Sequence, residues 1–362
     1  MRGLPDALLT WNEAILGYRF GDGHPFDQRR LVPTLDLMRS CGLIDAVVCR
    51  ESPVAARTEI ELTHQPDYVA LVQKASDPAF VAALDASGRR LLAEHGLGTE
   101  DDPTFAGMHE AAAAVVGASV SGAEALARGR AQHVFNPGGG LHHARAGRAA
   151  GFCIYNDVVA AIGRLRQAHG LRVAYVDMDA HHGDGVQWAF YDDPGFLFIS
   201  LHETGRYLFP GSGAIEERGE GGAYGNIWNV PLDAFTEDDS WLEVLRAVAF
   251  PVVKAFRPDV LVTQHGCDGH RLDPLTHLAL TTRSFQEGAT LMHRLAHEAA
   301  GGRWLALGGG GYDGWRVVPR AWTMVWAEMR HATLPEAMPA DWLRHWQPIS
   351  PVPLPETWLD NE

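Results

Sequence analysis

Residues 172–187 read RVAYVDMDAHHGDGVQ, and this stretch decides the fold. Its apolar, β-branched run at 173–176 predicts a buried strand in a parallel sheet covered on both faces. Polar residues begin abruptly after the run, with Asp177, Asp179 and His181 at two-residue spacing. If the chain stays extended there, these three side chains share one face. Because ligands bind beyond the carboxyl ends of strands in open α/β sheets, we expect a binding site here.

The same stretch favours a metal site over a simple helix cap. An isolated Asp-x-His motif would usually cap a helix, and a helix is expected to start near Gly185. Residues 177–184, however, hold three carboxylates, of which Asp184 is the third, and two histidines. Like charges that lie so close need a cation or protons. We therefore interpret this cluster as a metal site.

The composition is that of one large globular domain covering residues 1–362, since 46% of the residues are hydrophobic and 21% are charged. Thirty Lys and Arg against forty-five Asp and Glu give a net charge of −15, and no basic run interrupts that balance. This charge argues against nucleic acid or an anionic membrane as a partner. It weakly favours a cationic substrate.

The four cysteines, Cys41, Cys49, Cys153 and Cys267, show no Cys-x-x-Cys spacing. Neither a thiolate zinc site nor a disulfide framework is therefore expected, and a reducing cytoplasm is the expected location. The N-terminal residues lack the apolar run of a signal peptide. No segment approaches the roughly 20 apolar residues of a transmembrane helix.

Apolar periodicity predicts the other elements of an α/β fold. Strands are expected at 47–49, before the glycine loop at 138–140, and at 196–202, 260–263 and 304–307. Helices are expected at 31–42, 68–74, 110–128, 158–167, 241–256, 285–299 and 315–330. The motif-bearing core spans about residues 18–330, and the Pro-rich tail at 343–362 is predicted to be irregular.

His293 and His297 stand four residues apart on the helix predicted at 285–299, a spacing that can bind metal. No Glu accompanies them in a His-Glu-x-x-His order. We interpret them as ordinary helix residues.

Several strands end in glycine-flanked polar groups, which predicts one shared site. His142 and His143 follow a triple glycine, Asp268 follows the strand at 260–263, and Tyr312 follows four glycines. The triple glycine lacks the Lys-Ser/Thr of a phosphate-binding loop. Asp179, His181 and Asp268 are the natural metal ligands, with one coordination position left open. The histidines suit proton transfer and the tyrosine suits an oxyanion, which together favour hydrolysis of a carbonyl compound.

Five motifs in this order resemble those of the zinc-dependent histone deacetylase superfamily. They are GHP at 23–25, GGGLHH at 138–143, GFCIYND at 151–157, DMDAHHGDG at 177–185 and GGGGY at 308–312. LHHA at 141–144 and GCDGHRLDPLTHL at 266–278 are most similar to the bacterial acetoin-utilisation-type deacetylases. The resemblance implies an arginase/deacetylase-like α/β fold, a single-domain three-layer αβα structure with a central, mostly parallel sheet.

The resemblance also implies roles for the site residues. Zinc would be bound by Asp179, His181 and Asp268, although one His and two Asp do not exclude Fe²⁺. His143 would be the general base and acid, with His142 as its electrostatic partner and Tyr312 as the donor to the oxyanion. Asp177 and Asp184 would hold the two histidines. The expected reaction releases acetate and a free amine.

Substrate contacts and a second ion are implied in the same way. The substrate-binding residues would be Gly151, Phe152, Phe209 and Leu275 along a narrow channel, Asp101 at its rim and Arg30 in an inner cavity through which acetate leaves. A structural K⁺ would lie near Asp177, Asp179, His181, Ser200 and Leu201. The expected partner is the acetylated lysine of a protein, and the oligomeric state stays open.

The sequence leaves three alternatives to lysine deacetylation. The same centre could hydrolyse a small acetylated amine such as an acetylpolyamine, although no long insertion restricts the channel. An arginase-like binuclear manganese enzyme would need acids where Gly183 and Gly266 stand. A catalytically inactive module that binds acetyl-lysine would be favoured by loss of Tyr312, a histidine or a ligand, and all are present.

Overall fold

The computed structural model describes residues 6–45 and 48–360, and it is built around one sheet of eight parallel strands. The strand order is β2-β1-β3-β8-β7-β4-β5-β6. The strands are β1 (Ala7–Trp11), β2 (Cys49–Glu51), β3 (His133–Asn136), β4 (Val173–Asp177), β5 (Phe196–Glu203), β6 (Ile227–Leu232), β7 (Val260–Gln264) and β8 (Trp304–Leu307). Every residue of β3, β4, β5, β7 and β8 is buried, as expected for a parallel sheet covered on both faces.

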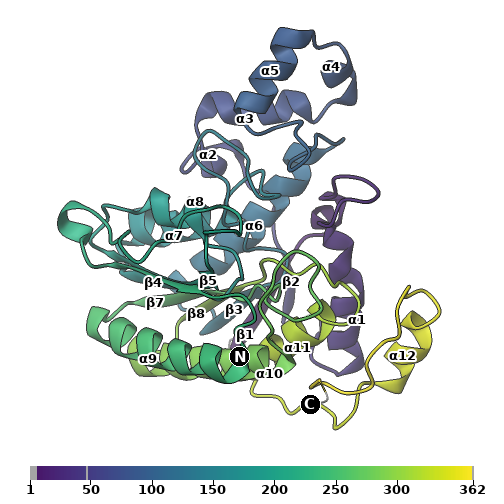
Figure 1. Ribbon diagram of the computed structural model, residues 1–362, viewed down its shortest axis with the longest axis vertical. Helices are drawn as coiled ribbons and strands as arrows, with labels where there is room; N and C mark the ends of the chain where they lie inside the picture. The colour runs from purple at the N-terminus through teal and green to yellow at the C-terminus, as the bar shows by residue number, and fades with distance from the viewer. Residues whose placement is uncertain (1–5, 46–47, 361–362) are drawn as a thin grey trace.

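Helices cover both faces of the sheet, which confirms the predicted three-layer αβα fold (Figure 1). One layer contains α6 (Met108–Ala127), α7 (Asp157–Gly163) and α8 (Asp184–Ala189). The other contains α9 (Asp238–Phe256), α10 (Thr282–Ala299) and α11 (Val318–Met329), and α1 (Leu31–Ser40) packs against α11. The helix predicted at 110–128 is α6, which is apolar on several sides because it packs against the sheet, α7 and η1.

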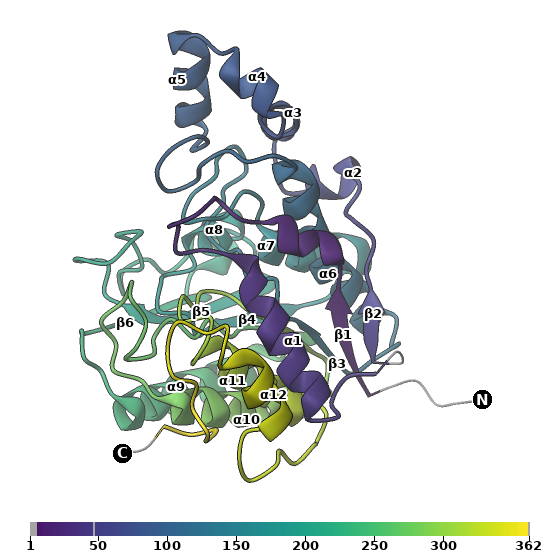
Figure 2. The ribbon, with the colours of Figure 1, turned by 90° about the vertical axis from the view of Figure 1, so that its right-hand side faces the viewer.

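Shorter helices lie outside these layers. Figure 2 shows α2 (Arg57–Ile60), α3 (Pro66–Ala75), α4 (Pro78–Ala82) and α5 (Ala86–Glu94) projecting from the body of the fold. The remaining turns of helix are η1 (Glu13–Gly17), η2 (Gln28–Arg30), the π-helical η3 (Arg164–Ala168) that continues α7, and η4 (Gly221–Ala223). Within the described residues no helix is long and apolar enough to cross a membrane. None of the four cysteines is in a disulfide.

Two strands were missed and one was misplaced in the sequence prediction. Strand β1 at Ala7–Trp11 is too short for a clear pattern and is held between β2 and β3 by tertiary pairing. Strand β6 contains Pro231, which argues against a strand, yet β6 is an edge strand where proline is tolerated. The strand predicted at 47–49 begins at Val47, which lies outside the described residues, and β2 starts only at Cys49.

The prediction of an irregular tail at 343–362 was wrong at its start. Helix α12 occupies Ala340–Trp346, and the tail packs onto the body of the protein. Trp342, Leu354 and Trp358 are buried in a separate apolar cluster with side chains of α1 and α11. The indole of Trp342 donates to the carbonyl oxygen of Pro33 at 2.9 Å. Proline content indicated loop structure, but the buried tryptophans fix the conformation of the tail.

Asp360 fastens the end of this tail to the body of the protein. Its carboxylate pairs with Arg320 Nη2 at 2.8 Å and with His270 Nε2 at 2.7 Å, and it accepts from the backbone N–H of Thr282 at 3.0 Å. Arg320 and His270 are both buried. Burial alone would raise the pKa of Asp360, but the hydrogen bonds from His270 and Thr282 and the charge of Arg320 outweigh it and hold the pKa well below its usual range.

We expect Asp360→Asn to lower the free energy of unfolding by about 3 kcal/mol at pH 7, because it leaves the buried Arg320 guanidinium without its carboxylate. The folded pKa of Asp360 is depressed, so its contribution is fully present above the unfolded pKa of about 3.9 and decreases progressively as pH falls from there through the folded pKa. Urea unfolding at pH 7 and at pH 3 measures both effects. Asp341→Asn, at an exposed position on α12, is the control. Equal midpoints for Asp360→Asn and wild type at pH 7 would contradict this account.

Candidate active site

The site begins where β4 ends. The strand stops at Asp177, so the extended continuation considered from the sequence is wrong. Instead, the N–H of Asp179 donates to Asp177 Oδ1 at 3.1 Å, and the N–H of His181 donates to Asp179 Oδ1 at 3.0 Å. Aspartate favours such turns because its carboxylate binds the amide two residues later. Two successive turns therefore gather the three side chains at the carboxyl end of the sheet.

Asp179, His181 and Asp268 form a buried group of possible metal ligands. One ligand atom from each lies within 4.8 Å of the other two. Asp268 arrives from the loop after β7, which is the neighbour of β4 in the sheet. Its Oδ2 lies 2.8 Å from His181 Nδ1, and Asp179 Oδ1 lies 3.3 Å from the same nitrogen. Burial, together with the carboxylate of Asp179, raises the pKa of Asp268 to about 6. Two buried carboxylates beside an imidazole are a donor set that suits a dication such as Zn²⁺ or Fe²⁺.

The glycine run at 308–311 lets the backbone pass close to these ligands. The N–H of Gly310 donates to Asp179 Oδ2 at 2.6 Å. A Cβ atom on Gly310 would lie only 2.0 Å from Asp268 Oδ2. Any larger residue would therefore displace Asp268, which explains in physical terms why glycine stands at this position.

His142 and His143 lie side by side next to the ligand group. Their Nε2 atoms are 3.0 Å apart. His142 Nδ1 lies 2.8 Å from Asp177 Oδ2, and His143 Nδ1 lies 2.8 Å from Asp184 Oδ1. A carboxylate that accepts a hydrogen bond from Nδ1 fixes the orientation of each ring, so that Nε2 points away from the carboxylate. The structure thus brings together the two histidine–carboxylate pairs that the sequence reading expected.

The two histidines sit in different electrostatic environments. Burial would lower the pKa of His142, but the carboxylates of Asp177 and Asp179 outweigh it and raise the pKa to about 9. Burial and the neighbouring His142 lower the pKa of His143 to about 4, against the effect of Asp184. The difference arises because two carboxylates act on His142, whereas His143 has Asp184 alone to offset its burial and the neighbouring His142. His142 is therefore the cationic member of the pair, and His143 is the neutral ring that can take up a proton at Nε2.

Tyr312, in the loop after β8, lies at the same site as the ligand group and the two histidines. A small central pocket is lined by residues that include His142, His143, Gly151, Asp179 and Tyr312. Burial and the nearby carboxylates of Asp268 and Asp179 raise the pKa of Tyr312 well above its ordinary value. The phenol therefore stays protonated and can donate a hydrogen bond into the pocket.

Two aromatic side chains flank this pocket. The Phe209 ring lies 4.9 Å from the His143 ring, and the Phe152 ring lies 5.7 Å from the Tyr312 ring. Gly151, between them, has a φ of +57°, and a Cβ there would lie 2.4 Å from the His143 ring. Its N–H donates to Asp101 Oδ2 at 2.8 Å. The structure thus brings Asp101, Gly151, Phe152 and Phe209 together beside the pocket.

Arg30 lies on the inner side of Tyr312. It is buried and donates to the carbonyl oxygens of Gly309 and Gly311. Arg30 and Tyr312 both line a second pocket of about 480 Å³, which also contains Trp315 and Trp346. Trp346 comes from α12, so the tail helps to form this pocket.

The remaining predicted residues lie at the edge of the site. The N–H of Leu275 donates to Asp273 Oδ1 at 3.0 Å, which places Leu275 in the loop after Asp268. For the predicted potassium site, Asp177 and Ser200 are register partners of β4 and β5, and Leu201 is the next residue of β5.

Two residues that the sequence reading did not assign also belong to the site. Asp273 Oδ2 accepts from the N–H of Tyr312 at 2.8 Å and so positions the tyrosine. Gln264, the last residue of β7, lies within hydrogen-bonding distance of His142, Asp179 and Tyr175. Asp273 could have been found from its place in the acid-rich run after β7. No sequence pattern around Gln264 indicates a role in the site.

The model of the histone deacetylase domain matches residues 24–329 of this chain. The chain belongs to the histone deacetylase family. The family member described here is 46% identical over 355 residues to the acetoin utilization protein AcuC of Bacillus subtilis, covering 98% of this chain and 90% of that protein. It is 40% identical over 359 residues to AcuC of Staphylococcus aureus, covering 99% and 90%. The predicted family and branch are thereby confirmed.

Solved structures agree with this family assignment. A crystal structure of an HDAC homologue in complex with SAHA matches with a TM-score of 0.84 and 31% identity, covering 94% of this chain and 89% of that chain. An HDAC homologue from Aquifex aeolicus matches with a TM-score of 0.83 and 30% identity, covering 94% and 88%. This histone deacetylase family member is therefore a deacetylase, and its family implies a metal cofactor, usually zinc.

Proposed function

We propose that this deacetylase is a zinc-dependent protein lysine deacetylase, which hydrolyses the amide of Nε-acetyl-lysine to acetate and free lysine. The observation that carries the proposal is the arrangement around the central pocket. Asp179 of the ligand group, the histidine pair and Tyr312 line this pocket, and the rings of Phe209 and Phe152 lie against His143 and Tyr312. Such aromatic walls suit the four methylenes of a lysine side chain.

Asp179, His181 and Asp268 would hold the catalytic metal, Zn²⁺ or alternatively Fe²⁺. When bound, it would act as a Lewis acid and lower the pKa of a water molecule. A structural K⁺ near Asp177, Asp179, His181, Ser200 and Leu201 is proposed to stiffen the turns after β4. Both ions remain proposals that rest on the family resemblance and on the donor atoms available.

The protein groups would carry the proton transfers. His143 Nε2 takes a proton from the attacking water, whose oxygen forms a bond to the carbonyl carbon of the acetyl group. The Tyr312 hydroxyl donates to the oxygen that becomes negative in the tetrahedral intermediate. His143 then returns the proton to the amine nitrogen as the C–N bond breaks. His142, held by Asp177, supplies positive charge beside the intermediate, and Asp184 orients His143.

Other residues would guide the substrate and the product. Asp101, together with Gly151 and Leu275, is proposed to hold the substrate backbone at the entrance. Arg30 offers a buried positive charge beside Tyr312, which suits the departure of acetate through the pocket of about 480 Å³. The net charge of −15 favours approach of a lysine-containing peptide.

Turnover of an acetyl-lysine peptide beside acetylputrescine tests this proposal. The purified, zinc-loaded protein is expected to release acetate from the peptide, and chelation is expected to stop the reaction. Turnover of acetylputrescine alone would instead establish the alternative function, hydrolysis of small acetylated amines. Binding of the peptide without any turnover would favour a catalytically inactive acetyl-lysine binding module.

Tyr312→Phe is expected to lower kcat for the peptide about 10²- to 10³-fold, because it removes one hydrogen-bond donor to the oxyanion. The change leaves the aromatic contact with Phe152 in place, so KM should change little. Steady-state kinetics measure both constants. Tyr224→Phe, at an exposed tyrosine, is the matched control. A kcat within threefold of wild type would exclude the proposed role of the hydroxyl.

A further inference from the structure

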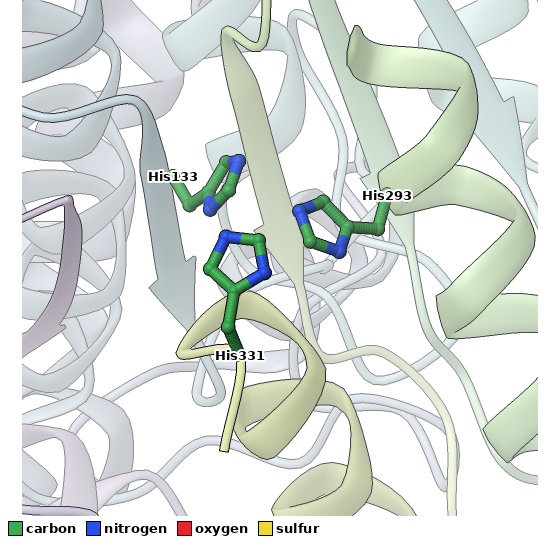
Figure 3. Close-up of side chains that lie close together, drawn as sticks. All are labelled: His133, His293 and His331. Carbon is green, nitrogen blue, oxygen red and sulfur yellow. The ribbon is translucent and has the colours of Figure 1, made fainter.

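Four histidines outside the active site gather at the opposite edge of the sheet, and we call them the histidine cluster. His133 is the first residue of β3, whereas the active site follows the last residues of the strands. His293 and His297 lie one turn apart on α10, and His331 follows the end of α11. Figure 3 shows the rings of His133, His293 and His331 turned toward one another. One ligand nitrogen from each of these three lies within 4.8 Å of the other two.

Hydrogen bonds fix the tautomers of the two buried members. His133 Nδ1 lies 3.0 Å from the carbonyl oxygen of Met329, which can only accept, so this nitrogen carries the hydrogen. His293 Nδ1 lies 2.8 Å from a carboxylate oxygen of Glu328 and also carries the hydrogen. In both neutral rings Nε2 is therefore a bare lone pair. A carbonyl or carboxylate on the second nitrogen is also how metal-bound histidines are usually held.

Both bare nitrogens face the same third ring. His297 Nε2 lies 3.2 Å from His133 Nε2 and 3.2 Å from His293 Nε2. A single hydrogen on His297 Nε2 can point at one of them, so at least one close pair of nitrogens has no hydrogen between them. A metal ion or an extra proton must resolve that repulsion.

Two nitrogen separations in the cluster match those between ligands of one metal ion. A tetrahedral zinc ion with nitrogens at about 2.0–2.1 Å separates those nitrogens by about 3.3 Å. The two separations of 3.2 Å in the cluster agree with that value. His297 and His331 are exposed, whereas His133 and His293 are buried, so an ion can enter from solvent and meet nitrogens that are already oriented.

We propose that His133, His293 and His331 bind a transition-metal dication such as Zn²⁺ at a second metal site, distinct from the catalytic one, with His297 beside them. Imidazole ligands alone favour Zn²⁺, Ni²⁺ or Cu²⁺ over Mg²⁺ and Ca²⁺. The site joins the start of β3, the second half of α10 and the end of α11. Its role is therefore structural: it ties the helical layer formed by α10 and α11 to the sheet.

Zinc stoichiometry of the full chain tests the proposal. Equilibrium dialysis against Zn²⁺ at pH 7.5, followed by elemental analysis, is expected to give two zinc ions per chain for wild type. The double variant His297→Gln/His331→Gln removes the exposed ligands only and is expected to bind one, with deacetylase activity retained. Asp268→Asn, which disrupts the catalytic ligand group, should also bind one. His345→Gln, at an exposed histidine on α12, is the matched control and should bind two.

A second measurement keeps the test independent of the catalytic site and of turnover. In the Asp268→Asn background, added Co²⁺ should produce visible absorption bands of a nitrogen-ligated ion and raise Tm. Both effects should vanish when His297→Gln/His331→Gln is added. Equal zinc content in wild type and the double variant, or no Co²⁺ bands in the Asp268→Asn protein, would overturn the second site and leave an extra proton as the account of the cluster.

Discussion

Asp268→Asn is expected to remove the catalytic metal and to lower kcat/KM for an acetyl-lysine peptide by at least about 10³-fold. The substitution takes one negative charge from the ligand group, where Asp268 Oδ2 lies 2.8 Å from His181 Nδ1. Lewis-acid stabilisation of the transition state is worth several kcal/mol, and each 1.36 kcal/mol is tenfold in rate. The remaining Oδ1 of asparagine can still accept from the N–H of Ala180, as Asp268 Oδ1 does at 2.9 Å. The fold should therefore survive.

Metal content and turnover, measured on the same preparation, check this prediction. The exposed Asp192 provides a matched control, because Asp192→Asn makes the same chemical change away from the site. A protein with Asp268→Asn that keeps both its full zinc content and its activity would show that the three residues are not the catalytic ligands.

His143→Ala is expected to lower kcat about 10²- to 10⁴-fold, the usual contribution of a positioned general base and acid. Its ring lines the central pocket beside Phe209, and its carboxylate partner Asp184 is shared with Arg145. His142 instead faces both Asp177, at 2.8 Å, and Asp179, at 3.9 Å. These two carboxylates favour the cationic form of His142. We therefore expect His143 to be the ring that moves the proton.

Steady-state kinetics separate this effect from loss of metal, since His143→Ala should keep its zinc whereas Asp268→Asn should not. His142→Ala provides the comparison and should have a smaller effect on kcat. A His143→Ala protein with at least one tenth of the wild-type kcat would assign the base to another group.

Local sequence patterns predicted the parts of the fold that depend on near neighbours. The apolar run at 173–176 predicted strand β4, because a buried strand needs apolar residues. The cluster of Asp177, Asp179 and His181 was predicted too, but with an extended backbone, whereas two successive aspartate turns gather these side chains. The family motifs then supplied the expected roles of residues farther along the chain.

Other features could not be predicted because they depend on packing between distant segments. The tail at 343–362 was predicted to be irregular, yet Trp358 and Asp360, together with Trp342 of α12, attach its described part to the body of the protein. His293 and His297 looked like ordinary helix residues, because nothing in their own helix shows that His133 meets them from β3. The four-residue spacing of these two histidines was the available signal in the sequence, but such a spacing is too common in helices to indicate a metal site.

The sequence by itself determined which residues end each strand and therefore which chemical groups lie at the carboxyl edge of the sheet. Only the tertiary structure decided which of those groups meet. Asp268 reaches His181 across 87 residues because β7 pairs with β4. His133 reaches His297 across 164 residues because β3 and β8 are neighbours and α10 leads into β8. Strand order in a parallel sheet is set by crossover connections and by burial of both faces, which no local pattern records.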